Sequence, residues 1–332
     1  MDSFEGILKL EPIDSVTNVD ESLFKRISDE GKPVLMKNCD FGVCMHIWNL
    51  EYLNERLENR DITIHESTES SLNFLKKNFA YKSCKFSEFA QILKKQSDPC
   101  QKSVYLRSIA SNSKKPARID TDFPEISDDL KPPSFIPYGN ENKLYHSSVL
   151  RIASKDVEIW THFDLYNNVL VQLVGAKRVL LIPPEDSKYL YLEGDKSRLF
   201  SFESPVENIH LFPLVHKARI YVAHLSPGDC LYIPSLWWHN IKTKTETSQR
   251  GDKPDYSIGF NIFWRDPQIE CNSYYARNDV YGNRNLLPYE SALSNLDKAV
   301  EHLNKLPEKY RQLYTEMLYH QFRKKFKIDD PT

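Results

Sequence analysis

The chain has 332 residues, 40% of them hydrophobic and 12% aromatic, so it is long enough to bury a large core. The 46 acidic residues and 44 Lys and Arg residues leave a formal net charge of -2, which excludes a strongly basic domain of the kind that usually binds nucleic acid. No apolar run approaches the roughly 18 residues of a membrane span, and the first residues lack the basic flank and apolar run of a signal peptide, so we expect a soluble intracellular protein, cytoplasmic or nuclear, with no membrane partner.

The first 130 residues are expected to form an α/β region that precedes and buttresses a barrel. Helices are predicted over residues 21–27 and 86–93, the second from a stripe of apolar side chains at helical spacing. Short β-rich runs predict strands over 33–36, 62–65 and 104–106. From 109 to 137 the chain is rich in Ser, Lys, Asp and Pro, which predicts an irregular connection.

The core, residues 131–270, is expected to be a closed β-sandwich with its strands between 144 and 264. His162 and Asp164 are two residues apart, so on one strand both side chains would point to the same face. His239 follows the apolar run 230–234 and would come from a neighbouring strand. Two imidazoles and one carboxylate form the ligand set of a mononuclear Fe(II) site. Taken alone, an H-x-D pair is as compatible with chance surface or core histidines.

Two apolar runs, 169–174 and 177–182, flank Gly175 and Ala176, which predicts a β-hairpin. In the second run Lys177 would share a face with Val179 and Leu181 and direct its ammonium into the barrel. The alternative is an exposed lysine at a turn.

The segment from Lys242 to Asp255 is polar and is expected to be a loop beside the third ligand, either gating the site or forming a simple surface insertion. Residues 285–328 are expected to form two amphipathic helices. The first has a stripe of Leu293, Leu296, Val300 and Leu303, and the second, opened by Pro307, has Tyr310, Leu313, Tyr314, Met317 and Leu318. Such a pair must cover something: a second copy in a homodimer, or the chain's own barrel.

As a set, the segments 162–184, 225–241 and 261–264 resemble the cupin-type JmjC oxygenases. The resemblance implies a mainly β fold with flanking helices, a double-stranded β-helix (jelly-roll) core, and an enzyme that uses Fe(2+), 2-oxoglutarate and O2. It implies that His162, Asp164 and His239 bind the iron. It further implies a co-substrate pocket lined by Tyr105, Asn168, Lys177 and Asn261. Thr161 is a departure, because many relatives place the co-substrate threonine at the position of Ile159.

The chemistry of the co-substrate explains these residue types. Its distal carboxylate costs several kcal/mol to bury unless a cation and hydroxyl donors meet it, and Lys177 and Tyr105 are the candidates. Oxidative decarboxylation to succinate would then drive hydroxylation of a C–H bond. The protein supplies ligation, orientation and exclusion of water.

Segments across almost the whole chain, inside and outside the barrel, resemble the hydroxylases of tRNA wybutosine synthesis: 77–81, 105–108, 188–192, 280–283 and 306–311. This implies that the substrate is the 3-amino-3-carboxypropyl side chain of a wybutosine-type base in tRNA(Phe). The basic clusters available for RNA are Lys114, Lys115 and Arg118, and Arg323, Lys324 and Lys325; taken singly, each is more typical of a solvated face. Two alternatives stay open: a JmjC protein hydroxylase acting on Asn, Asp, Lys or Arg side chains, which suits the near-neutral charge, and a non-catalytic JmjC-like module.

Overall fold

The computed structural model describes residues 8–95, 102–194, 196–199, 201–202, 210–244, 254–269, 272–277 and 279–328. The chain divides into two compact units. The first consists of Met1–Glu270 and Asn278–Asn283, and the second of Cys271–Arg277 and Arg284–Thr332. Each is described by itself.

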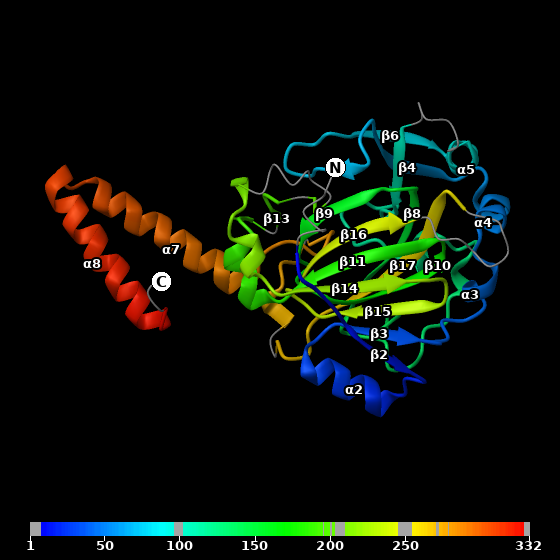
Figure 1. The fold of residues 1–332 in the computed structure, drawn as a ribbon, viewed down its shortest axis with the longest axis horizontal. Coiled ribbons are helices and arrows are strands. Elements are labelled where there is room, and N and C mark those ends of the chain that lie inside the picture. Colours follow the sequence, from blue (N-terminus) through cyan, green and yellow to red (C-terminus); the bar gives the residue numbers. More distant parts are fainter. Residues whose placement is uncertain are drawn as a thin grey trace. The chain divides into compact units, whose positions relative to one another are not determined.

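The first unit is built on an eight-stranded and a nine-stranded sheet (Figure 1). In order across the first sheet lie β1 (Leu10–Pro12), β14 (Ile220–Leu225), β11 (Ala176–Ile182), β16 (Trp238–Lys244), β9 (Glu158–His162), β13 (Lys196–Ser197) and β12 (Leu192–Glu193), with β5 (Ser71–Leu72) also on β9. In order across the second lie β2 (Asp14–Thr17), β3 (Val34–Lys37), β15 (Asp229–Ile233), β10 (Asn167–Val174), β17 (Tyr256–Trp264), β8 (Tyr145–Ser154), β7 (Ser103–Arg107), β4 (Asp61–Ser67) and β6 (Ala80–Lys85).

The two sheets pack face to face through their apolar side chains. Leu170 and Leu231 of the nine-stranded sheet lie in one buried cluster with Val179, Leu181 and Leu225 of the eight-stranded sheet. From β8 to β11, each strand lies in the opposite sheet from the strand before it, and the same holds from β14 to β17. Between these two runs, β11 and β14 lie in the same sheet. This alternation confirms the predicted double-stranded β-helix, with its strands between Tyr145 and Trp264.

The prediction of a β-hairpin around Gly175 is wrong. β10 pairs with β15 and β17, whereas β11 pairs with β14 and β16 in the other sheet. A single residue joins the two strands, so the chain turns the corner of the sandwich and does not fold back on itself. Gly175 has φ +70°, and a Cβ there would lie 2.5 Å from the carbonyl oxygen of Tyr256. Only glycine fits both the backbone conformation and the space.

The predicted N-terminal helices are confirmed as α2 (Glu21–Glu30) and α5 (Phe86–Lys94), with α3 (Cys44–Ile47) and α4 (Leu50–Leu57) in addition. Asp20 caps α2 by accepting a hydrogen bond from the backbone N–H of Leu23, and Gly31 ends it in the left-handed conformation. These helices bury their apolar faces against the nine-stranded sheet in the largest core cluster. The predicted N-terminal strands are β3, β4 and β7, and they add directly to that sheet.

Residues 109–137 are irregular as predicted, apart from α6 (Ile119–Asp122) and a 3-10 turn at Ser127–Asp129. Further 3-10 turns span Pro184–Tyr189 and Val215–Lys217. In the loop predicted over 242–255, Lys242 to Lys244 belong to β16. Residues 245–253 lie outside the described residues, so gating by this loop stays a prediction.

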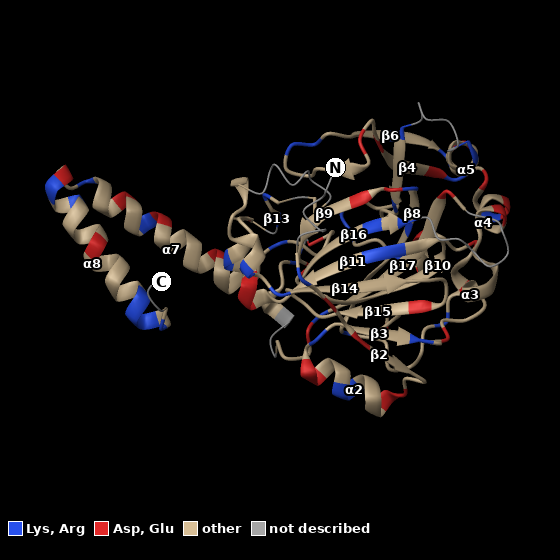
Figure 2. Cartoon of the chain, in the orientation of Figure 1, with Lys and Arg blue, Asp and Glu red and all other residues tan. Residues whose placement is uncertain are grey.

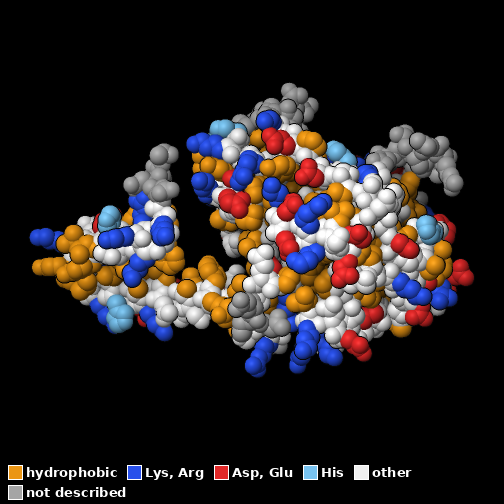
Figure 3. Space-filling view, turned by 90° about the horizontal axis from the view of Figure 1, so that it is seen from below, with side chains coloured by type: hydrophobic (Ala, Val, Ile, Leu, Met, Phe, Trp, Pro, Cys, Tyr) orange, Lys and Arg blue, Asp and Glu red, His pale blue; other side chains and the backbone are white. Residues whose placement is uncertain are grey.

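The second unit contains a 3-10 turn, Asn272–Tyr274, and the two predicted helices, α7 (Leu287–Asn304) and α8 (Glu308–Phe326), with Pro307 as the N-cap of α8. The two helices pack against each other, yet neither has a buried residue. Figure 3 shows apolar side chains gathered on the surface of this pair. The exposed members are Leu293, Leu296, Val300, Tyr310, Leu313, Tyr314, Met317 and Leu318. Within the described residues, none of the helices is both long and apolar enough to cross a membrane.

Candidate metal centre and its cleft

His162, Asp164 and His239 come together at one point of the sandwich. One potential ligand atom from each lies within 4.8 Å of the other two. Nε2 of His239 is 3.5 Å from a carboxylate oxygen of Asp164, and the two imidazole rings are 4.3 Å apart between centroids. His162 is directly opposite His239 in the β9–β16 pairing. Sequence-remote histidines are therefore adjacent in space, as predicted.

The route by which Asp164 arrives differs from the prediction. β9 ends at His162, so Asp164 follows the strand and is not part of it. Phe163 turns away and packs its ring on Trp238, with centroids 4.9 Å apart. The carboxylate reaches the histidines from the start of the connection to β10.

Both histidines are held in the form that a metal needs. Nδ1 of His162 lies 2.8 Å from the carbonyl oxygen of Trp160, and Nδ1 of His239 lies 3.0 Å from that of Trp237. A carbonyl accepts a hydrogen bond, so each Nδ1 carries the proton and each Nε2 is left as a donor atom for a metal. Burial lowers the pKa of both rings, that of His162 well below its usual value, and keeps them neutral.

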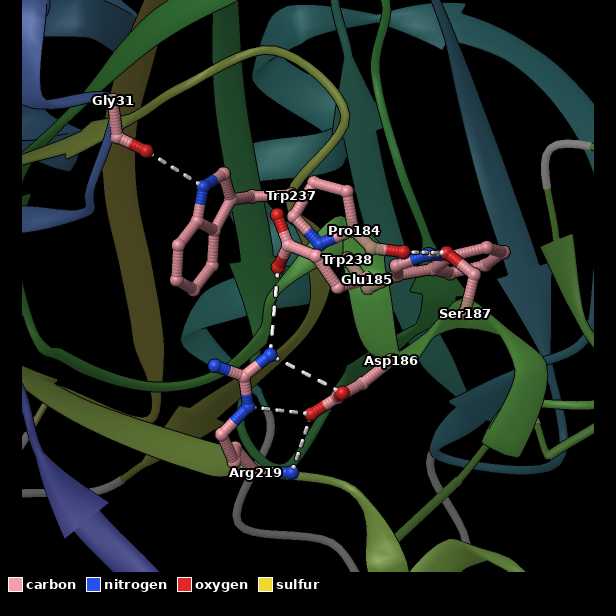
Figure 4. Close-up of polar contacts among 8 residues, drawn as sticks. All are labelled: Gly31, Pro184, Glu185, Asp186, Ser187, Arg219, Trp237 and Trp238. Atoms are coloured by element: carbon pink, nitrogen blue, oxygen red, sulfur yellow. Dashed lines mark hydrogen bonds and ion pairs between the residues drawn. The ribbon is translucent and has the colours of Figure 1, made fainter. Parts of the chain in front are cut away.

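The two tryptophans that directly precede His239 in the chain anchor the segment that carries it (Figure 4). The indole N–H of Trp237 donates to the carbonyl of Gly31 at the end of α2, and that of Trp238 donates to the hydroxyl of Ser187. Elements far apart in the chain thus fix the entry into β16.

A buried carboxylate also ties β9 to β16. Glu158 accepts hydrogen bonds from the hydroxyls of Ser71 and Ser201, both at 2.6 Å, and from the amide of Asn240 at 2.9 Å. Burial raises the pKa of Glu158. Because Asn240 directly follows His239, these bonds hold the two ligand-bearing strands in register.

His162 and Asp164 lie in a cleft of about 250 Å³. Its wall is aromatic and cationic, and the lining includes His65, Phe74, Tyr81, Tyr105, Arg107, Arg151, Trp160, Lys196, Phe263 and Tyr281. The rings of Phe74 and Trp160 are 3.6 Å apart, and that of Trp160 stacks on His162 at 4.4 Å. A larger cavity of about 720 Å³ lies around Arg219 and Trp237, where Arg219 pairs with Asp186 (Figure 4). It contains none of the three ligands, so chemistry and not size identifies the site.

The predicted co-substrate residues are linked by one arginine that sequence reasoning missed. Nε of Arg151 donates to Oδ1 of Asn261 at 2.6 Å, and its Nη1 donates to the hydroxyl of Tyr105. Asn261 in turn donates to Oδ1 of Asn168 at 2.9 Å. Arg151 belongs to β8, and its position in an otherwise buried run was the available signal.

Lys177 is buried as predicted, beneath the metal cleft. With Tyr105 and Arg151 it lines a small cavity, and the latter two also line the metal cleft. Its Nζ donates to Oε1 of Gln172 at 2.5 Å and to the hydroxyl of Ser257 at 2.6 Å. Burial and Arg151 lower the pKa of Lys177 to about 7. Thr161 is fully buried, its hydroxyl has no hydrogen-bond partner in the described part of the chain, and it lines neither cavity.

The residues of the two predicted basic clusters differ in how exposed they are. Lys114 and Lys115 are exposed, whereas Arg118 is half-buried with its guanidinium over the ring of Tyr145. Lys324 and Lys325 are exposed at the end of α8, where Arg323 lies 5.7 Å from the ring of Tyr319. Figure 2 shows basic residues at the end of α8, and basic and acidic positions interspersed elsewhere along the chain.

Comparison with known proteins identifies the family to which this chain belongs. Residues 20–270 match the model of the cupin-like domain family. The chain is 35% identical to tRNA wybutosine-synthesizing protein 5 of Danio rerio over 91% of this chain and 89% of that protein, and 32% identical to the Homo sapiens protein over 90% of each. It is also 34% identical to tRNA wybutosine-synthesizing protein 4 of Neurospora crassa, over 96% of this chain but only 25% of that protein. The chain therefore belongs to the cupin-like family, in the group that includes tRNA wybutosine-synthesizing protein 5.

Proposed function

We propose that this chain is an Fe(II)- and 2-oxoglutarate-dependent hydroxylase that modifies the wybutosine-type base of tRNA(Phe). The convergence of His162, Asp164 and His239 at the cleft carries the proposal. Two neutral imidazoles and a carboxylate are the donor set of a mononuclear iron oxygenase. Bound iron would supply the oxidising chemistry, and the chain's own residues would orient both substrates and exclude water.

A small cavity of about 20 Å³ shares Tyr105 and Arg151 with the cleft, and the polar residues in its lining suit the second carboxylate of a keto acid that is bound in the cleft. Arg151, Lys177 and the Tyr105 hydroxyl meet there and could hold that carboxylate, while the other end of the keto acid lies at the metal. Among the residues that the structure describes, the buried amide nitrogen of Asn168 has no hydrogen-bond partner, and an added acceptor would satisfy it. These residues fit 2-oxoglutarate.

The names of the relatives and the shape of the cleft support a tRNA substrate. The relatives are named for wybutosine synthesis, and the cleft has aromatic faces on which a flat base removed from its stack could lie. We therefore place the protein among the tRNA-modifying enzymes of the cell interior, in the cytoplasm or nucleus.

The direct test measures succinate formation and product mass together. Purified protein with ferrous ion, 2-oxoglutarate and O2 is given tRNA(Phe) from cells that lack the protein. The expected product is one mole of succinate for each base that gains the mass of one oxygen. Turnover with peptides but not with tRNA would instead favour the protein hydroxylase, which the net charge of -2 suits. Absence of 2-oxoglutarate turnover with every substrate would favour the non-catalytic module.

The apolar surface of α7 and α8 supports a homodimer. Large side chains such as Leu296, Leu313 and Met317 are more than half exposed, although the two helices already pack against each other. A second copy of the pair, related by a two-fold axis, would bury this surface. Sedimentation at micromolar concentration should give twice the chain mass of 38.9 kDa, and a monomer would remove the proposal.

A further inference from the structure

Two arginines face the same cleft from neighbouring strands. Arg107 of β7 is directly opposite Arg151 of β8 in the antiparallel pairing, and both side chains line the cleft. Like charges in directly opposite positions destabilise a sheet. The pair therefore favours an anion in the cleft.

The two guanidinium groups differ in their partners. Arg151 is engaged by Asn261 and Tyr105. Within the described part of the chain, the side chain of Arg107 makes no hydrogen bond and no salt bridge; its guanidinium lies over the ring of Tyr281, 5.1 Å from the centroid. Burial and Arg151 lower the pKa of Arg107 only to about 10, so it stays charged at neutral pH. Arg107 is thus a half-buried cation, held in place by a ring, whose donors are available to a ligand.

The charged residues that line the cleft indicate that it binds a second anion besides the keto acid. The cleft and the cavity beneath it are lined by Arg107, Arg151, Lys177 and Lys196, with Asp164 as the acidic residue. A dicarboxylate with one end at the metal and the other between Arg151 and Lys177 leaves Arg107 without a counter-charge. Arg107 lines the same cleft as the metal ligands His162 and Asp164.

We propose that Arg107 binds the carboxylate of the substrate base's amino-acid side chain, and so makes the enzyme select the free acid over a neutral ester. This rests on the proposed function and on the 3-amino-3-carboxypropyl side chain that the resemblance to the wybutosine hydroxylases implies for the base. Phe74 and Trp160, whose tilted rings lie 3.6 Å apart, line the same cleft as Arg107. An anionic anchor at Arg107 would hold the side chain beside the reacting centre while the base lies on these rings. Arg107 acts on specificity and positioning.

The test compares two tRNAs that differ only in that carboxylate. One carries the side chain as the free acid and the other as its methyl ester. Wild-type protein is expected to prefer the acid. Arg107→Gln should raise the KM for the acid by about 10- to 100-fold, as expected for loss of a hydrogen bond between charged groups, and leave the KM for the ester nearly unchanged. Arg107→Lys should restore part of the preference.

The matched control is Arg56→Gln. Arg56 is exposed on α4, with its guanidinium 5.9 Å from the ring centroid of Tyr52, and lies outside the cleft lining. It should leave both KM values unchanged. If Arg107→Gln raised the KM for the acid and for the ester equally, the residue would act on a phosphate or on packing, and the proposal would be overturned. An unchanged KM for the acid would overturn it as well.

Equilibrium binding of the same two tRNAs separates this proposal from the proposed function. If wild-type protein forms no succinate with either tRNA, the hydroxylase assignment fails. The acid-over-ester preference in binding, and its loss in Arg107→Gln, can still be measured without turnover. Equal affinity of wild-type protein for both tRNAs would overturn the role of Arg107 even if hydroxylation occurs.

Discussion

Nζ of Lys177 donates a hydrogen bond to Oε1 of Gln172 at 2.5 Å, and these two residues lie on either side of Gly175 in the chain. Gln172 is a neutral acceptor. The second partner, the Ser257 hydroxyl, is neutral as well. A buried ammonium with neutral partners and a nearby guanidinium loses its proton readily, and its pKa falls to about 7. An incoming carboxylate would reverse this and favour the charged form.

The affinity for 2-oxoglutarate should therefore depend on pH. Below about pH 7 Lys177 is already protonated; above it, the free protein has lost the proton that the bound carboxylate requires. The KM for 2-oxoglutarate is expected to rise as pH increases from 7 to 9, by up to about tenfold per pH unit. Steady-state kinetics in overlapping buffers would measure this.

Lys177→Met provides the matching variant. It should raise the KM at pH 6 and remove the pH dependence, since no group is left to titrate there. Lys37→Met, at a partly exposed lysine paired with Asp229, should leave both unchanged. A KM for wild-type protein that stays constant from pH 6 to 9 would exclude this role for Lys177.

Removing any metal ligand should abolish turnover without unfolding the protein. His162→Ala, Asp164→Ala and His239→Ala each delete one donor of the set. The surrounding sheets are held by large apolar clusters, so the melting temperature should move by only about 2–4 °C. Calorimetric titration with ferrous ion under anaerobic conditions should show lost binding. His216→Ala, at an exposed histidine, should bind the ion normally.

Gly175→Ala should destabilise the fold strongly. Its φ of +70° disfavours any side chain, and the new Cβ would meet the Tyr256 carbonyl at 2.5 Å. The backbone term alone costs about 1–3 kcal/mol, and the clash adds to it. Gly194→Ala is the matched control: φ is +63° there, but no atom lies within 4 Å, so only the backbone term applies. Urea unfolding of both variants would measure the difference, and equal losses would show that the close approach is unimportant.

Local pattern was enough to predict much of this molecule. Apolar periodicity predicted α5, α7 and α8, and β-rich runs predicted most strands of the sandwich. The H-x-D pair and the distant His239 were predicted to converge because residue type and spacing restrict the chemistry to few ligand sets. The stripes on α7 and α8 predicted two amphipathic helices, but a stripe alone does not show which surface covers it.

Long-range pairing was not predictable in the same way. Two apolar runs around a glycine look alike whether they form a hairpin or cross between sheets, and only the pairings with β14, β15, β16 and β17 decide. Arg151 escaped notice because an arginine in a strand usually faces solvent. Its role depends on Tyr105 and Asn261, which are 46 and 110 residues away in the chain.

Affinity for tRNA should fall steeply with salt, and the cluster at the end of α8 should contribute. Lys324→Glu with Lys325→Glu replaces two exposed cations, and each lost phosphate contact should lower the slope of log affinity against log salt by about 1. Filter binding between low and physiological salt would measure it. Lys25→Glu, at an exposed lysine on α2 that pairs with Asp29, should keep the wild-type slope. Because the net charge of -2 gives no general attraction for RNA, a wild-type affinity independent of salt would mean that neither cluster binds phosphate.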